Sequence, residues 1–244
     1  MHGYAEHSAR YEPMALWFAE RGCVVQAYDQ RGHGRSEGVR CHVERFEEFL
    51  DDLALVLDAV RSEHPELPIT LVGHSMGGLV TLAFLTARKP RVASAVTSGA
   101  LLSVGAVSPV RVALARAARR VLPRFAVGSG IDPEGLSRDP EVVRRYLADP
   151  LIRRTMTTSL GCELLAAAPR TAALAGEVDV PLLVLHGEAD PICPVEGSRA
   201  FHAGVRAAGG ALRVYAGLRH EIFNEPEREA VWQDVWRWLE ELSE

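Results

Sequence analysis

The hydrophobic and polar positions of this chain follow two alternating patterns. Continuous apolar runs, which are typical of buried parallel strands, occur at 24–28, 69–72, 93–98, 181–186 and 212–215. Between them lie longer segments with apolar residues three and four positions apart, and the clearest amphipathic helices are expected at 43–64 and 227–242. Strands that alternate with helices predict an α/β fold, in which helices cover both faces of a mostly parallel sheet.

The alternation stops between residues 100 and 180, which predicts an insertion in the sheet fold. We therefore expect a core made of 1–100 and 179–244, and a helical cap made of 101–178. Within the cap, Asp132-Pro133 and Asp139-Pro140 predict turns, and a further helical segment is expected over 138–160.

One stretch of the cap is amphipathic at helical spacing. One face of the expected helix is apolar and carries Val107, Val110, Leu114, Ala118, Val121 and Phe125. Much of the remaining surface is basic and carries Arg111, Arg116, Arg119, Arg120 and Arg124. Two interpretations are open: the apolar face contacts lipid headgroups and delivers an acyl chain, or the helix is a lid packed on its own core.

A G-x-S-x-G motif, Gly73-His74-Ser75-Met76-Gly77, lies between the apolar run at 69–72 and the helical segment that begins at Leu79. This context predicts a nucleophile elbow, a sharp strand-to-helix turn that lifts a serine hydroxyl above the sheet. Glycines are needed two residues either side of the serine, because side chains there would collide with neighbouring backbone. Ser75 is therefore the candidate nucleophile.

A serine hydroxyl needs a base to take its proton and an acid to orient that base. Asp190 follows the expected strand at 181–186, and His220 follows the expected strand at 212–215. Serine, acid and histidine then occur in the order found in α/β-hydrolases. Competing acids are Glu188, in the same loop, and Asp179, which is more remote; His186, at a strand end, is interpreted as structural.

Four motifs in register carry a family resemblance that extends from residue 2 to the end of the chain. They are His2 to Tyr11 (HGYAEHSARY), Asp29 to Gly38 (DQRGHGRSEG), Gly73 to Gly77 (GHSMG) and His220 to Glu225 (HEIFNE). Together they resemble the monoacylglycerol lipase and lysophospholipase group of the α/β-hydrolases, among the serine aminopeptidase S33-like enzymes. The resemblance implies an α/β-hydrolase fold with a helical cap insertion.

The resemblance also implies roles for individual residues. The backbone N–H groups of Tyr4 and Met76 are the expected oxyanion hole. Glu6 and Arg10 are candidate contacts to the polar head of the substrate, or alternatively a structural pair that braces the oxyanion loop. Some members carry a second histidine where this chain has Phe223, which weakens the inference of strict glycerol selectivity.

The expected function is hydrolysis of a lipid carboxylic ester, most simply a monoacylglycerol or a lysophospholipid, through an acyl-enzyme on Ser75. No cofactor and no metal are expected. Because fold and triad leave the substrate open, thioesterase or peptidase activity is an alternative, and an inactive remnant is another. The oligomeric state is left open.

Composition narrows these possibilities. The formal net charge is -5, so nothing favours nucleic-acid binding. The four cysteines, Cys23, Cys41, Cys162 and Cys193, show no metal or disulfide spacing and suit a reducing interior. With no secretory signal and no long apolar run, we expect a cytoplasmic enzyme that at most touches a membrane peripherally through its cap.

The start of the chain departs from the family pattern. There the His-Gly of the oxyanion loop ends a buried central strand, whereas this chain begins at Met1-His2. We expect the first strands to be absent and the chain to be an N-terminally truncated hydrolase. The two flanking strands would then collapse together or leave a gap filled by loop, and Tyr4 would be poorly held.

Overall fold

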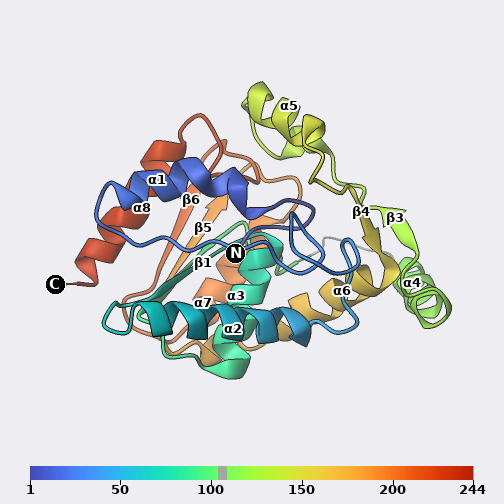
Figure 1. The fold of residues 1–244 in the computed structure, drawn as a ribbon, viewed down its shortest axis with the longest axis horizontal. Coiled ribbons are helices and arrows are strands. Elements are labelled where there is room, and N and C mark those ends of the chain that lie inside the picture. The colour runs from blue at the N-terminus through green and yellow to red at the C-terminus, as the bar shows by residue number, and fades with distance from the viewer. Residues whose placement is uncertain (104–108, 244) are drawn as a thin grey trace.

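The computed structural model describes residues 1–103 and 109–243 and contains a four-stranded parallel sheet (Figure 1). The strand order is β1-β2-β5-β6. In chain order the strands are β1 (Thr70–His74), β2 (Ser94–Ser98), β5 (Leu182–Gly187) and β6 (Ala211–Tyr215). All adjacent pairs are parallel, as the alternation of strand and helix predicts.

Helices cover both faces of this sheet. On one side lie α1 (Glu12–Ala19) and α8 (Arg228–Glu241), and on the other lie α2 (Glu47–Glu63), α3 (Met76–Arg88) and α7 (Val195–Gly204) (Figure 1). Short 3₁₀ turns occur at Ser8–Tyr11, Pro133–Gly135 and Ala175–Glu177.

Alternate residues of the central strands divide the core in two. Val96, Leu183 and Leu185 pack with α1 and α8. Their strand neighbours Ala95 and Leu182 pack with α2, α3 and α7. Because successive side chains of a strand point to opposite faces, a strand covered on both faces is buried along its whole length, as β2 and β5 are.

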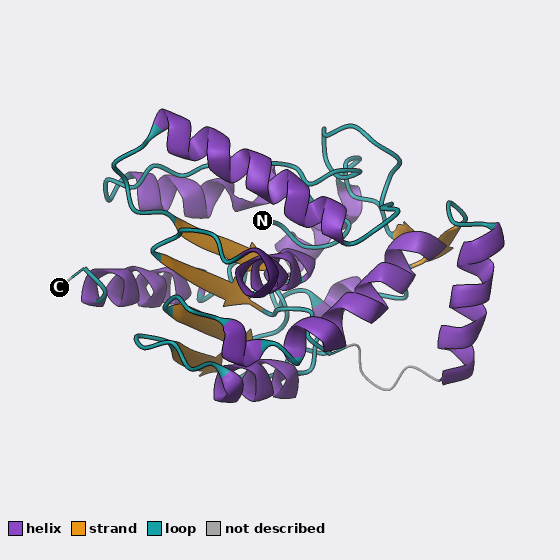
Figure 2. Ribbon diagram, turned by 90° about the horizontal axis from the view of Figure 1, so that it is seen from below, coloured by secondary structure: helices purple, strands orange, loops and turns teal. Residues whose placement is uncertain are grey.

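The elements between β2 and β5 lie beyond one end of the sheet, and the strand arrows point towards them (Figure 2). They are α4 (Pro109–Val121), β3 (Ala126–Gly128), α5 (Pro140–Ala148), β4 (Thr155–Thr157) and α6 (Thr158–Ala172). Strands β3 and β4 form a two-stranded antiparallel ribbon. The last of these helices, α6, belongs to the same hydrophobic core cluster as α3. The division of the chain into a core and a cap at 101–178 stays a prediction.

The helical segment expected over 138–160 is present only in part. Asp139 caps the start of α5, with its side chain accepting the Glu141 N–H, and the helix ends at Ala148. Asp149 is extended, with ψ at 119°, because the ring of the following Pro150 disfavours helical backbone there. The chain then enters β4 before it becomes helical again.

The strand expected at 24–28 is wrong, because the structure assigns no strand pairing to this segment within the described residues. Val24 and Val25 are 56% and 44% exposed. A strand needs a neighbour along its length, and the first residues of the chain lie beside β1. The Met1 nitrogen donates to the Val72 carbonyl at 2.6 Å, and the His74 N–H donates to the Met1 carbonyl at 3.0 Å.

The residues that follow are nevertheless well held. The Gln30 N–H donates to His2 Nε2 at 2.9 Å. This hydrogen bond joins the residues that follow the 24–28 segment to the start of the chain. Tyr4 is partly buried against the core, and its ring meets that of His33 edge-on at 6.3 Å. The expectation that Tyr4 would be loosely placed is therefore not what the structure shows.

Candidate active site

The turn between β1 and α3 is as sharp as the motif predicts. Ser75, between the two elements, has φ 53° and ψ -117°, a conformation that is strained for a residue with a side chain. A Cβ on Gly73 would overlap the Gly77 carbonyl, and a Cβ on Gly77 would lie 2.5 Å from the His2 carbonyl oxygen. The prediction that only glycine fits at both positions is confirmed.

The structure brings together the three residues that were predicted from far apart in the sequence. They lie where β1, β5 and β6 end, at one edge of the sheet. The Ser75 hydroxyl donates to His220 Nε2 at 2.9 Å, and His220 Nδ1 donates to Asp190 Oδ2 at 2.7 Å. This is the hydrogen-bonded order in which histidine can accept the serine proton while the carboxylate fixes its tautomer.

The surroundings keep Asp190 ionised. Burial acts to raise the pKa of its carboxyl, but hydrogen bonds from His186 and His220 outweigh that effect and hold the pKa well below its usual range. Its Oδ1 also accepts the N–H groups of Ile192 and Cys193, at 2.8 and 2.9 Å. A permanently charged carboxylate at this position stabilises a protonated His220.

His220 responds accordingly. Burial acts to lower the pKa of its imidazole, yet the hydrogen bond and the charge of Asp190, followed by the charges of Glu221 and Glu6, raise the pKa above its usual value. The competing acids play no such part, because Glu188 and Asp179 are both exposed, whereas the Asp190 side chain is fully buried.

Two histidines beside this centre were not recognised from the sequence. His186 Nε2 lies 3.1 Å from Asp190 Oδ2 and 2.9 Å from the Cys193 carbonyl, so it supports the acid rather than merely filling the core. The His74 ring lies 4.7 Å from that of His220. Burial, and then the nearness of His220, lower the pKa of His74 to about 3, so it packs against the base as a neutral ring. Its position directly before Ser75 was the available signal.

The loop that carries the expected oxyanion donors lies against the nucleophile. A Cβ on Gly3 would lie 3.2 Å from Ser75 Cβ, so the backbone of the N-terminal arm, residues 1–10, passes close to the serine. Within the described residues, the Tyr4 N–H has no hydrogen-bond partner. Met76 is the first residue of α3, and the first N–H groups of a helix have no intrahelical acceptor. Both groups are therefore open to an incoming oxygen.

Glu6 is buried, the Arg10 side chain is 11% exposed, and the two form an ion pair. Arg10 also forms a two-pronged ion pair with Glu221, at 2.7 Å for each contact. Burial acts to raise the pKa of Glu6, but the Arg10 charge lowers it below its ordinary value. Phe223 is buried in the core cluster of α8, away from a headgroup role.

The fold and the site geometry together define the class of protein as an α/β-hydrolase with a Ser-His-Asp arrangement at the sheet edge. The family model described as serine aminopeptidase, S33 matches residues 1–227. The chain belongs to this family.

Similar proteins support this assignment. A monoacylglycerol lipase of Mycolicibacterium smegmatis is 40% identical over 98% of this chain and 85% of its own length. A phospholipase of Bacillus subtilis is 31% identical over 96% of this chain and 90% of its own length. The crystal structure of a monoacylglycerol lipase from Paleococcus ferrophilus matches with a TM-score of 0.89 and 32% identity, covering 100% of this chain and 92% of that one.

The elbow contacts lead to a prediction about Gly77. In Gly77→Ala the new methyl group would push the Met1–His2 backbone away, and overpacking of this kind costs about 1–3 kcal/mol of folding free energy. For a chain of this size we expect the melting temperature to fall by roughly 3–10 °C. Gly128→Ala is the matched control, because nothing lies within 4 Å of its Cβ position. Equal melting of the two variants would contradict the close contact at the elbow.

Proposed function

We propose that this protein is a serine hydrolase that cleaves carboxylic esters of lipids. The observation that supports this most is the continuous hydrogen-bonded chain from Ser75 through His220 to a buried, ionised Asp190. Ser75 is the proposed nucleophile, His220 the base and Asp190 the orienting acid. The Tyr4 and Met76 N–H groups are the proposed oxyanion hole.

The proposed reaction has two stages. His220 takes the hydroxyl proton while Ser75 attacks the ester carbonyl, and the two N–H donors stabilise the resulting oxyanion by about 3–4 kcal/mol each. Protonated His220 then gives its proton to the departing alcohol, which leaves an acyl group on Ser75. Water, activated by the same histidine, releases the acid in the second stage.

Substrate class rests on the relatives. The curated relatives cited above are named monoacylglycerol lipase and phospholipase, which favours an ester with a long acyl chain and a small polar head. A monoacylglycerol and a lysophospholipid both fit that description. Thioester or peptide hydrolysis would use the same three residues, and a non-catalytic remnant would keep their geometry without turnover.

Labelling with a fluorophosphonate probe tests the proposal. Because only an activated serine reacts with such a probe, we expect the wild-type protein to be labelled and Ser75→Ala to remain unlabelled. Hydrolysis rates for monoacylglycerols, lysophospholipids, acyl thioesters and aminoacyl amides would then rank the substrate classes, with the glycerol or phosphate-headed esters expected first. Absence of labelling in folded wild-type protein would refute the proposed serine hydrolase activity.

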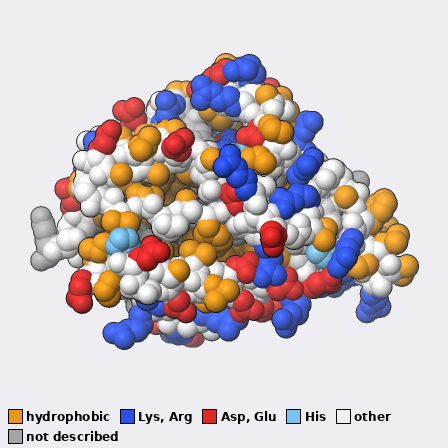
Figure 3. All heavy atoms as spheres, viewed as in Figure 1, with side chains coloured by type: hydrophobic (Ala, Val, Ile, Leu, Met, Phe, Trp, Pro, Cys, Tyr) orange, Lys and Arg blue, Asp and Glu red, His pale blue; other side chains and the backbone are white. Residues whose placement is uncertain are grey.

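We further propose that the cap contacts a membrane surface peripherally. Figure 3 shows hydrophobic side chains gathered at the end of the molecule over α4, with basic side chains beside them. The exposed apolar residues there include Leu114, Val121, Leu122 and Phe125. Such a surface, flanked by arginines, suits the boundary between headgroups and acyl chains. None of the helices that the structure describes is long and apolar enough to cross a membrane.

Sedimentation with lipid vesicles tests the cap contact. Val121 is 78% exposed on the cap, and Leu55 is 70% exposed on α2. Replacing either residue with serine therefore removes a similar amount of apolar surface, at two different places. We expect Val121→Ser to reduce the fraction bound to vesicles containing anionic lipid, because less apolar area enters the interface. Leu55→Ser should bind as the wild type does. If both changes reduced vesicle binding equally, or if neither reduced it, the proposed membrane contact of the cap would be contradicted.

A further inference from the structure

Two buried carboxylates share one half-buried arginine next to the candidate active site. Glu6 and Glu221 are 2% and 3% exposed, and Arg10 lies between them. Arg10 Nη1 donates to Glu6 Oε2 and, at 2.7 Å, to Glu221 Oε1, while Nη2 donates to Glu221 Oε2 at 2.7 Å. We call these three residues the clamp.

One end of the clamp holds the loop that carries the proposed oxyanion donor. Glu6 Oε1 accepts the Gly3 N–H, and it also accepts the Tyr11 hydroxyl at 2.7 Å. Gly3 directly precedes Tyr4. The orientation of the Tyr4 peptide therefore depends on the position of the Glu6 carboxylate.

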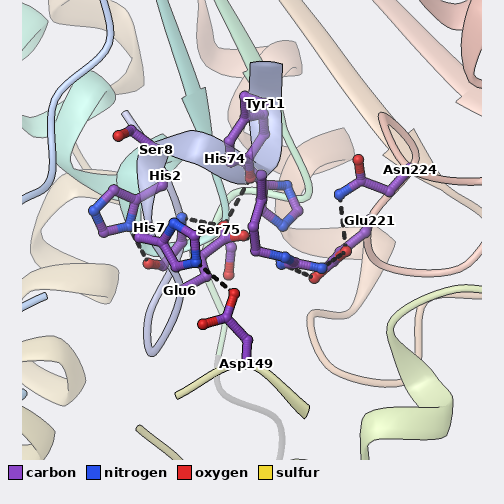
Figure 4. Close-up of polar contacts among 12 residues, drawn as sticks. His2, Glu6, His7, Ser8, Tyr11, His74, Ser75, Asp149, Glu221 and Asn224 are labelled. Carbon is purple, nitrogen blue, oxygen red and sulfur yellow. Dashed lines mark hydrogen bonds and ion pairs between the residues drawn. The ribbon is translucent and has the colours of Figure 1, made fainter. Parts of the chain in front are cut away.

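The other end holds the loop that carries the proposed base. Glu221 directly follows His220, and its Oε2 accepts a hydrogen bond from Asn224 Nδ2 at 2.9 Å, a contact visible in Figure 4. The backbone N–H of Glu221 donates to the Leu136 carbonyl at 2.8 Å, which ties the same loop to the cap. Arg10 thus joins two loops that are more than two hundred residues apart in the sequence.

Most of the hydrogen-bonding groups of the clamp are paired with one another or with neighbouring protein groups. Both terminal nitrogens of the guanidinium donate to carboxylates, and all four carboxylate oxygens accept hydrogen bonds. The guanidinium also lies over the Tyr146 ring, with its carbon 5.3 Å from the ring centre. The carboxylate oxygens are occupied within the protein, and both terminal nitrogens of Arg10 point at them, so this arrangement favours the bracing alternative for Glu6 and Arg10.

We infer that Glu6, Arg10 and Glu221 form a positioning clamp that sets the separation between the oxyanion donor at Tyr4 and the base at His220. The inference rests on the proposed serine hydrolysis and deepens it. None of the three side chains needs to touch the substrate. Errors of about 1 Å in such a separation can lower a rate roughly a hundredfold, which is why a rigid, doubly hydrogen-bonded arginine suits the position.

The clamp also acts on His220 electrically. The charged and titratable groups around the imidazole are Asp190 from the loop after β5, His74 from the end of β1, Glu6 and Arg10 from the N-terminal arm, and Glu221 from its own loop. Within the clamp, two carboxylates face one guanidinium, which leaves one negative charge to favour the protonated histidine.

Arg10→Lys, measured on two esters, tests the positioning role. Lysine keeps the charge but cannot make the two-pronged contact. On both a monoacylglycerol and 4-nitrophenyl butyrate, which has no glycerol head, we expect kcat to fall by a similar factor, roughly 10- to 100-fold, with little change in KM. A loss confined to the monoacylglycerol and seen in KM would instead make Arg10 a headgroup contact and overturn the clamp.

A milder variant covers the case in which Arg10→Lys unfolds. Tyr11→Phe removes only the hydroxyl that Glu6 accepts. We expect a smaller loss of kcat in the same direction on both esters. Wild-type kcat on both esters would count against the clamp.

Glu221→Gln tests the electrical role through the pH profile of kcat/KM. Loss of the negative charge should make His220 harder to protonate, so the acid limb should move to lower pH by about half a unit or more. Glu225→Gln is the matched control. Glu225 is buried in the same loop and accepts the Arg219 N–H at 2.7 Å. Its carboxylate is paired with a different arginine, Arg138, at 3.4 Å. We expect that variant to leave the acid limb in place.

An unchanged profile in Glu221→Gln, or an equal shift in both variants, would refute the electrical role. Fluorophosphonate labelling of the wild type, carried out first, distinguishes failure of the proposed hydrolysis from failure of the clamp. If the wild type is not labelled, the proposed hydrolysis fails; if it is labelled and the clamp variants behave as the wild type, only the clamp fails.

Discussion

The close approach of the N-terminal arm to the nucleophile elbow is the constraint on which the rest of the site depends. Gly77 has no room for a side chain because the Met1 and His2 carbonyls occupy that space, and Gly3 passes directly over Ser75. This contact brings the backbone that leads to Tyr4 close to the start of α3. Without this contact, the proposed nucleophile and base would lack one of the two proposed oxyanion donors.

Charge buried behind the reacting groups supports this geometry. Asp190 is held ionised by His186 and His220 and by two backbone N–H groups, so the proposed base always faces a negative partner. Arg10 joins the arm to the histidine loop through two carboxylates. Breaking a buried ion pair leaves an uncompensated charge in a poorly solvated place, so such links hold loops more firmly than surface pairs do.

The sequence predicted the candidate active site better than it predicted the elements around it. Ser75, Asp190 and His220 each follow an apolar run, and the carboxyl ends of parallel strands meet at one edge of the sheet, so their meeting could be foreseen. The parallel sheet and the helices α2 and α8 follow from hydrophobic periodicity in the same way.

What sequence reasoning missed depends on neighbours that a local pattern does not contain. An apolar run at 24–28 has strand propensity, but no strand pairs with it in residues 1–103 and 109–243. The role of Glu221 requires Arg10 to reach it from the other end of the chain. The break in the expected helix at Asp149 did have a local signal, the following proline, which the broader helical pattern concealed.

We expect an ester that reacts at Ser75 to place its carbonyl oxygen between the Tyr4 and Met76 N–H groups while His220 stays within reach. A crystal structure of the protein with a phosphonate ester bound covalently to Ser75 tests this most directly. One phosphonate oxygen should lie within hydrogen-bond distance, about 2.7–3.1 Å, of both backbone nitrogens. A phosphonate on Ser75 whose oxygens reach neither nitrogen, with the arm unmoved, would contradict it.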